Sequence, residues 1–185
     1  VVCFKKFGEK KVTKWINPTP AQIEWLVQQV LVGFNNRRYD NHILYGRLMN
    51  ASNMDLFRQS QDIIDKDSKN GMFSGAYELS YADIYDYSSE KMGLKKWELK
   101  LGIKHDEFEL PWDQPVPEHL WPRVADYCGN DVEATEEVFK ATMHDYTARL
   151  ILSKLSGLNA NATTTQHTAA FLFGSEARPQ DKFKY

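Results

Sequence analysis

Residues 30–49, with the sequence VLVGFNNRRYDNHILYGRLM, contain the pattern that decides the fold class of this chain. The opening VLVGF is a short apolar run typical of a buried strand, and the two asparagines after it suit a turn. Between Tyr39 and Met49 apolar residues recur at helical spacing, so we expect Asp40 to lie near the N-terminus of a helix. A strand, a polar turn and a helix with an acidic start form a ligand site that α/β proteins place at the carboxyl edge of their sheet. The stretch therefore predicts an α/β fold with a candidate site at Asp40.

A second acidic motif, Tyr127-Cys128-Gly129-Asn130-Asp131, precedes another stretch with helical periodicity. From Asp131 to Ile151 apolar and small residues recur every three or four positions, as if the carboxylate began the helix. If the helix begins a turn earlier, near Pro122, then Tyr127 and Asp131 lie on one face. Metal-dependent hydrolysis needs a carboxylate to hold the cation and a hydrogen-bonding group to aim the water molecule. The pair supplies both groups and predicts part of a two-metal phosphodiester-cleaving site.

A purely structural explanation of the second motif stays open. In that explanation Asp131 is a solvated carboxylate in the first turn of a helix, where it favours the helix dipole, and Tyr127 packs on the core. The presence of both motifs in this order, at a separation that one domain can span, favours the functional interpretation.

The two motifs together resemble the DEDD-type 3′-5′ exonucleases, in the subgroup whose third motif is Tyr-x-x-x-Asp. The second family motif, Asn-x-x-Tyr/Phe-Asp, matches Asn36 to Asp40, and the third matches Tyr127 to Asp131. The proofreading exonuclease domain of phage replicative DNA polymerases is similar to most of the chain, from about Val1 to Leu158. The stretches that carry this similarity are VGFNN (32–36), SEKMGLKKWELKLG (89–102), LPWDQPV (110–116) and YCGNDVEAT (127–135).

The resemblance implies a ribonuclease H-like exonuclease fold, in which helices flank a mixed central sheet. It implies removal of the 3′-terminal nucleotide of single-stranded DNA with two divalent cations, Mg²⁺ or Mn²⁺. Asp131 would then hold one cation, Asp40 would reach the other through water, and Tyr127 would orient the nucleophile. Asn36 and Tyr39 would contact the terminal nucleotide.

One family motif has no counterpart in this sequence. The first motif, Asp-x-Glu, provides two of the four metal carboxylates in the family, and no such sequence precedes Asn36. Two carboxylates do not readily hold two hard cations that each prefer about six oxygen ligands. We therefore expect the chain to be part of a longer active protein, and by itself to bind metal weakly and to be inactive or nearly so.

The segment between the motifs contains the candidate contacts to substrate. Leu94, Trp97 and Leu101 form an apolar stripe at helical spacing, beside which Lys95 and Lys96 are available to phosphates. A merely solvated helix face, with glutamates nearby, explains these lysines equally well. Phe108 and Trp112 are candidates for stacking on a base, although roles in packing are commoner for aromatic side chains.

Composition is consistent with one folded domain. The chain has 185 residues, of which 42% are hydrophobic and 13% aromatic, so it can bury a substantial core. Its formal net charge of −2 gives no overall basic character, and a nucleic acid would need a local electropositive groove. Cys3 and Cys128 are too few for a disulfide scaffold and are expected to be reduced. No apolar run reaches the length of a membrane span, so we expect a cytoplasmic protein without a membrane partner, in a bacterial host if the phage resemblance holds.

Other parts of the chain give local predictions. Residues 1–16 suggest a hairpin of two strands, and Thr19-Pro20-Ala21-Gln22 has the form of a capping box before a short helix that ends near Gln28. Residues 55–65 are expected to be helical, and residues 66–75 to form a mobile surface loop. We assign residues 1–158 to the exonuclease domain. Residues 159–185 are assigned to a linker and the start of a covalently attached polymerase region.

Two other classes of protein share these features. A free-standing DEDD-type ribonuclease would carry both motifs but should end near residue 158. A catalytically silent module that binds DNA or supports a polymerase would carry the same scaffold without the first motif.

Overall fold

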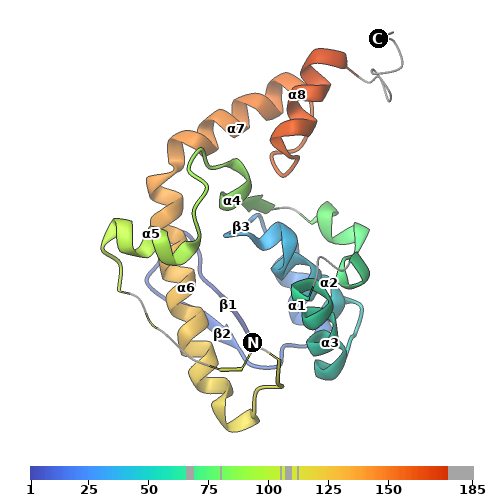
Figure 1. Cartoon of the computed structure of the whole chain (residues 1–185), viewed down its shortest axis with the longest axis vertical. Coiled ribbons are helices and arrows are strands. Elements are labelled where there is room, and N and C mark those ends of the chain that lie inside the picture. The colour runs from blue at the N-terminus through green and yellow to red at the C-terminus, as the bar shows by residue number, and fades with distance from the viewer. Residues whose placement is uncertain (66–68, 80, 105, 107–109, 112, 175–185) are drawn as a thin grey trace.

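The computed structural model describes residues 1–65, 69–79, 81–104, 106, 110–111 and 113–174. Helices predominate in this part of the chain, and its strands form two small two-stranded sheets (Figure 1). The strands are β1 (Val2–Phe4), β2 (Thr13–Trp15), β3 (Leu31–Gly33) and β4 (Tyr81–Asp83). The helices are α1 (Pro20–Val27), α2 (Asp40–Leu48), α3 (Asn53–Ile64), α4 (Ile84–Tyr87), α5 (Leu94–Leu101), α6 (Trp121–Ala141), α7 (Met143–Ser156) and α8 (Thr164–Phe173). The chain is therefore a mixed α/β protein, as residues 30–49 predict.

The N-terminal segment forms the predicted antiparallel hairpin. Val2 of β1 pairs with Trp15 of β2, and Phe4 pairs with Thr13. The rings of Phe4 and Trp15 meet edge to face at 4.6 Å, and Trp25 of α1 lies 6.0 Å from Trp15. This aromatic group joins the hairpin to α1, while α6 packs against both strands (Figure 1).

The first helix begins as its sequence predicts. The Thr19 hydroxyl accepts a hydrogen bond from the backbone amide of Gln22, and the Gln22 side chain accepts one from the amide of Thr19. This reciprocal pair satisfies two amides that have no partner within the helix, and Pro20 fits the first turn because it has no amide hydrogen. The capping-box prediction is confirmed.

Strands β3 and β4 form the sheet that positions the first motif. They run parallel, with Leu31 beside Tyr81 and Gly33 beside Asp83. Helices α2 and α3 lie between these strands in the chain (Figure 1). Because the strands are parallel, their carboxyl ends meet, and Asp83 stands beside the turn that follows Gly33.

The main apolar cluster lies between this sheet and α6. Its buried members come from β4, α4, α5 and α6: Ala82, Ile84, Tyr87, Trp97, Val138 and Phe139. Ile84 and Val138 have no exposed surface at all. The cluster fixes α6, and with it the second motif, relative to the parallel strands.

The second helical stretch begins at Trp121, which confirms the alternative with a start near Pro122 and places Asp131 well inside α6. It differs from the prediction at its other end. It is not continuous to Ile151, because α6 ends at Ala141 and α7 begins at Met143. Thr142 separates them and is buried, with its hydroxyl donating to the Val138 carbonyl at 2.8 Å. A hydroxyl that bonds back to the preceding turn often bends a helix. The bend at Thr142 therefore divides a stretch whose apolar periodicity is continuous in the sequence.

The segment predicted as a mobile loop is partly structured. Its residues 66–68 lie outside the described residues, but Lys69–Gly71 and Ser74–Glu78 form 3₁₀ turns. Gly71 is buried, and its carbonyl accepts a hydrogen bond from the Gln59 side chain at 3.0 Å. Contact with α3 therefore orders part of this segment, and its predicted mobility stays a prediction.

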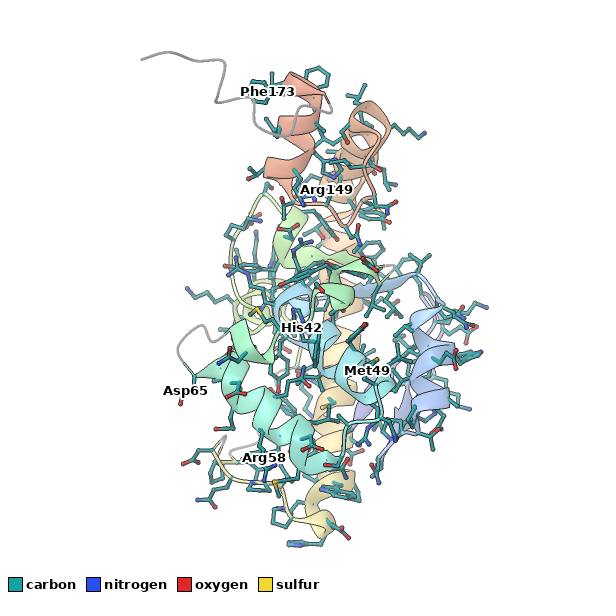
Figure 2. The ribbon with its side chains drawn as sticks, turned by 90° about the vertical axis from the view of Figure 1, so that its right-hand side faces the viewer. His42, Met49, Arg58, Asp65, Arg149 and Phe173 are labelled. Carbon is teal, nitrogen blue, oxygen red and sulfur yellow. The ribbon has the colours of Figure 1, made fainter. Side chains whose placement is uncertain are left out.

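Helices α7 and α8 lie side by side at one end of the molecule (Figures 1 and 2). Arg149 of α7 lies where α7 and α8 meet, and Phe173 is near the outer end of α8 (Figure 2). None of the helices in the described ranges combines the length and apolar character that a bilayer crossing requires.

Candidate functional site

The turn after β3 carries the first motif and is held by Asp83. Asn35 adopts a left-handed conformation (φ 58°), and Asn36–Arg38 form a 3₁₀ turn. The Asp83 carboxylate accepts the backbone amides of Asn35 at 2.8 Å and Arg37 at 2.9 Å. A carboxylate on the neighbouring strand therefore fixes the path of the chain into Asp40, the first residue of α2.

Asp40 is a carboxylate with an unusual environment. Its side chain is exposed to solvent, yet burial among protein atoms raises its pKa from 3.8 to about 6, with a smaller increase from the charge of Asp83. Burial and the charge of Asp83 thus disfavour the ionised form of a carboxylate that solvent still reaches. A perturbed carboxylate in such a position is a candidate for a functional group.

Asn36 is buried beneath the same turn. It is 5% exposed, its amide nitrogen donates to the Asn41 side chain at 3.2 Å, and its carbonyl oxygen has no partner among the described residues. A Cβ on Gly33 would lie 2.8 Å from Asn36 Cγ, so the side chain fits because residue 33 is glycine.

Tyr39 is anchored by another helix. Its hydroxyl shares a 2.7 Å hydrogen bond with Ser60 of α3, and burial raises its pKa. The phenol thus already has a structural partner, and its predicted contact with a terminal nucleotide stays a prediction.

Tyr127 and Asp131 lie one turn apart on α6, as the second motif predicts. Burial raises the pKa of the Tyr127 phenol, and the charges of Asp131 and Glu98 raise it further. The phenol and the carboxylate are therefore electrostatic neighbours. The alternative in which Asp131 interacts with the start of a helix dipole does not apply, because Asp131 is well inside α6.

An electrostatic influence links the first motif to Cys128 of the second. Besides burial, the charges of Asp40 and Cys128 raise the pKa of Tyr39, so Cys128 lies near the first motif. Cys128 directly follows Tyr127, and Asp131 contributes to raising its pKa. Residues separated by nearly half of the chain therefore influence each other electrostatically.

The described residues do not form a complete metal site. They contain no group of three or more His, Cys, Asp or Glu side chains placed to hold a metal ion. Among the described residues, Asp83 is the carboxylate whose charge raises the pKa of Asp40, and Asp131 is one of those that raise the pKa of Tyr127. Asp40 and Asp131 alone do not fit two hard cations, each of which needs more oxygen ligands.

The lysines predicted to contact phosphates lie on α5. Lys95 and Lys96 are exposed, while Trp97 and Glu98 are buried against the rest of the molecule. Lys100 on the same helix pairs with Glu90 and lies 4.8 Å from the centre of the Trp97 ring. The predicted contacts of Lys95 and Lys96 with phosphates stay predictions. The other aromatic candidates, Phe108 and Trp112, lie outside the described residues.

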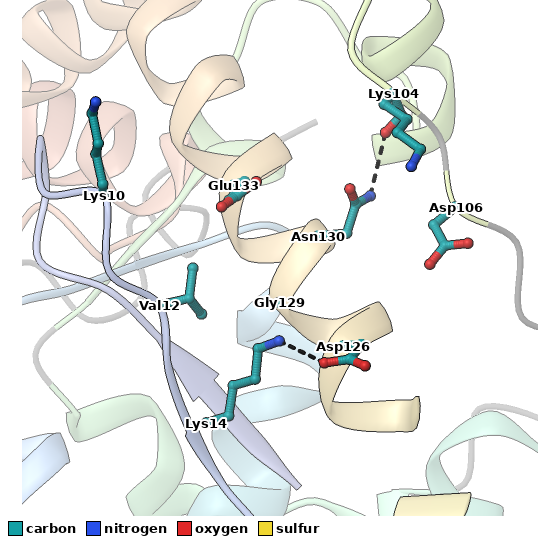
Figure 3. Close-up of a pocket in the computed structure, with 9 residues that line it drawn as sticks. All are labelled: Lys10, Val12, Lys14, Lys104, Asp106, Asp126, Gly129, Asn130 and Glu133. Carbon is teal, nitrogen blue, oxygen red and sulfur yellow. Dashed lines mark hydrogen bonds and ion pairs between the residues drawn. The ribbon is translucent and has the colours of Figure 1, made fainter. Parts of the chain in front are cut away.

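Two open pockets accompany the motifs. The larger has a volume of about 390 Å³ and lies between α6 and the segment 10–14 (Figure 3). Lys14 pairs with Asp126 there at 2.8 Å, and Asn130 donates to the Lys104 carbonyl. Cations and carboxylates alternate around it, so it does not select a charge.

The smaller pocket was not predicted. It has a volume of about 320 Å³ and is lined by Asn35, Arg37, Arg38, Asp83, Tyr85, Asp86 and Lys91. Asp83 is a residue of the candidate site that was not predicted, although a pattern in the sequence marks it. It ends the apolar Tyr81-Ala82 pair and begins a helical segment, which is the same strand-then-carboxylate pattern as residues 30–40.

Comparisons with protein-family models, with curated proteins and with solved structures found no match to this chain.

Proposed function

We propose that this chain is the 3′-5′ exonuclease part of a phage DNA polymerase with a ribonuclease H-like fold. Its substrate is the 3′ end of single-stranded DNA, hydrolysed with two divalent cations, Mg²⁺ or Mn²⁺, in the cytoplasm of a bacterial host. The observation that carries the proposal is the position of Asp40 after the turn at the carboxyl edge of the parallel strands, a turn held by Asp83. The influence of Cys128 on the pKa of Tyr39 adds an electrostatic link to the second motif.

The proposed roles of the residues come from the resemblance, and the positions of these residues are consistent with them. Asp40 stands at the carboxyl edge of the parallel strands with a raised pKa, which suits a carboxylate that binds a cation or a water molecule. Tyr127 and Asp131 lie one turn apart on α6 and form the second group, in which the phenol would orient a nucleophile. Because the donor set is incomplete, the chain by itself is expected to have weak metal affinity and little activity.

An attached polymerase region is supported by the far end of the molecule. Ile151, Leu155, Phe171 and Leu172 are each more than half exposed on α7 and α8. A group of exposed apolar side chains is typical of a surface that contacts another domain or protein.

The test is 3′-5′ cleavage of end-labelled single-stranded DNA with Mg²⁺ or Mn²⁺. The chain is compared with the same protein extended upstream by residues that include an Asp-x-Glu motif. Activity confined to the extended protein supports the proposal. An extended protein that folds but does not cleave would contradict it.

Substitutions in the extended protein separate chemistry from folding. Asp131→Ala is expected to abolish cleavage and to leave polymerisation largely intact. Asp126→Ala, which removes an exposed carboxylate of the same helix, should leave both activities unchanged. Equal loss of both activities in Asp131→Ala would indicate misfolding.

A catalytically silent DNA-binding or structural module is the second candidate. It is favoured by the lack of a three-donor metal group in the described residues. Under this alternative the extended protein binds DNA without cleaving it. Cleavage of RNA in preference to DNA would instead support a ribonuclease.

A further inference from the structure

The smaller pocket lies at the same sheet edge as Asp40. Its walls come from the turn after β3, which supplies Asn35, Arg37 and Arg38, and from the end of β4 with α4. We name it the turn pocket. Ligands of open α/β sheets bind at the carboxyl ends of the strands, and Asp40 follows the same turn.

The acidic side chains of the turn pocket are already neutralised or bonded. Asp83 accepts three backbone amides, from Asn35, Arg37 and Tyr85. Asp86 lies 3.6 Å from the guanidinium of Arg149. These partners occupy the oxygens of the two carboxylates, and the cations that line the pocket, Arg37, Arg38 and Lys91, outnumber them.

The cations of the turn pocket keep donors available. One terminal guanidinium nitrogen of Arg37, Nη1, donates to the Tyr81 hydroxyl and to the Asn161 carbonyl. The guanidinium also lies over the Tyr77 ring, 4.9 Å from its centre. Its other guanidinium nitrogens have no partner among the described residues. Arg38 is exposed, and no side chain or carbonyl of the described ranges pairs with its guanidinium.

Lys91 completes the positive group on the opposite wall. Its ammonium donates to the carbonyls of Tyr85 at 2.6 Å and Asp86 at 2.9 Å, which holds it in place with one proton still available. The half-buried Tyr85 ring lies 5.5 Å from this ammonium. Fixed cations beside an aromatic ring are the combination that single-strand binding proteins use for backbone and base.

We propose that the turn pocket binds a phosphodiester of a single-stranded nucleic acid, upstream of the terminal nucleotide at Asp40. The direction of the bound nucleic acid, with its 3′ end at Asp40, rests on the proposed function. The volume of about 320 Å³ suits a small polar group and not a long apolar ligand. The contacts would be to the backbone and would carry no sequence preference.

The test measures binding without cleavage. A short fluorescein-labelled oligothymidylate is titrated with the chain in EDTA at several salt concentrations, and fluorescence anisotropy gives Kd. Arg38→Gln is expected to weaken binding about fivefold and to reduce the salt dependence by roughly one counterion. Arg38→Gln/Lys91→Gln should weaken binding further.

Arg58→Gln is the matched control, because Arg58 is an exposed arginine on α3 away from the turn pocket. Its Kd should equal that of the unaltered chain. An oligothymidylate with methylphosphonate linkages has no backbone charge for Arg38 to contact. Its Kd should therefore be the same for the unaltered chain and for Arg38→Gln. Circular dichroism should show the same folded content in every variant.

Three outcomes overturn the inference: an unchanged Kd in Arg38→Gln, an equal loss in Arg58→Gln, or full competition by inorganic phosphate, which would indicate a site for a free anion. Because the assay contains no metal, it is independent of cleavage. Binding that depends on Arg38 supports the turn pocket even if the extended protein proves inactive. If binding does not depend on Arg38, the result of the cleavage test is unaffected.

Discussion

Asp40 is costly for the folded state because the protein around it disfavours its charge. The pKa of Asp40 rises to about 6 through burial and the charge of Asp83. Between the ordinary value of 3.8 and pH 6 the folded chain therefore binds a proton that the unfolded chain releases. The contribution of Asp40 to stability falls as the pH rises through this interval. A stabilising substitution at a functional position is a common sign that stability has been given up for activity.

Asp40→Asn should accordingly stabilise the chain at neutral pH. Because solvent screening reduces the effect at an exposed side chain, we expect a gain of about 1 kcal/mol at pH 7 that decreases toward zero near pH 4. Urea denaturation across this pH range measures it. Asp62→Asn, an exposed carboxylate of α3, is the control and should show no comparable pH-dependent gain. A destabilised Asp40→Asn at pH 7 would contradict the proposed environment.

Gly33 permits the close approach of Asn36. Gly33→Ala would place its Cβ within 2.8 to 3.1 Å of the Asn36 side chain, so Asn36 must move or the turn must shift. We expect a loss of about 1 to 3 kcal/mol in the free energy of unfolding, and a changed side-chain amide resonance of Asn36. Gly93→Ala is the control, because no atom lies within 4 Å of its added Cβ. Its effect should stay below about 1 kcal/mol. Equal losses in both variants would exclude the steric explanation.

Among the elements, α6 connects most of the structure. It packs against the hairpin, α5 and α7, and it carries Tyr127 and Asp131. Near its end Glu136 pairs with Lys5 after β1 and with Lys140, each at 2.8 Å. Burial alone would raise the pKa of Glu136, but the two lysines outweigh it and lower the pKa below the ordinary 4.5.

Glu136→Gln should destabilise the chain at neutral pH. A lowered pKa means that the stabilisation is present above the ordinary value and is lost as the pH falls through the lower folded value. We expect a cost of about 1 to 3 kcal/mol at pH 7, because Lys5 would keep its charge in a largely buried position without its partner. Chemical denaturation at pH 7 and pH 3 tests this, and the difference from the unaltered chain should shrink at pH 3. Glu137→Gln removes an exposed carboxylate of the same helix and should change stability by less than about 0.5 kcal/mol.

The elements that could be predicted from sequence depend on local chemistry. The capping residues at Thr19 define the start of α1, and the turn before Asp40 follows from its own residues. The break at Thr142 and the order in residues 69–75 depend on contacts made elsewhere, which periodicity does not encode. The site shows the same division. The positions of Asp40, Tyr127 and Asp131 on their helices follow from spacing, whereas the carboxylate of Asp83 reaches the turn through the pairing of β3 with β4.

At the scale of the whole molecule, the segment after α7 is joined to the parallel strands. The Asn161 side chain donates to the carbonyls of Tyr77 at 3.2 Å and Leu79 at 3.1 Å, and its own carbonyl accepts from Arg37. Arg149, which is 3% exposed, bonds the Ala162 carbonyl and the Thr164 hydroxyl. Residues 161–164 therefore behave as part of the folded domain.

Asn161→Ala should lower the free energy of unfolding by about 1 to 2 kcal/mol, because two carbonyls lose their donor. Thermal unfolding followed by circular dichroism measures the change. Asn159→Ala, an exposed asparagine two residues earlier, should have little effect. Equal stability of Asn161→Ala and the unaltered chain would support a free linker from residue 159.

Capping boxes begin α1, α3 and α8, and this has a consequence for the order of folding. Helices whose starts are defined by their own neighbours can form transiently within about a microsecond, before the rest of the chain collapses. The parallel pairing of β3 with β4 must wait, since all of α2 and α3 lies in the loop that it closes. Formation of this sheet edge should therefore be the slow step, and a refolding chain would acquire the helix signal of α1, α3 and α8 before β3 pairs with β4.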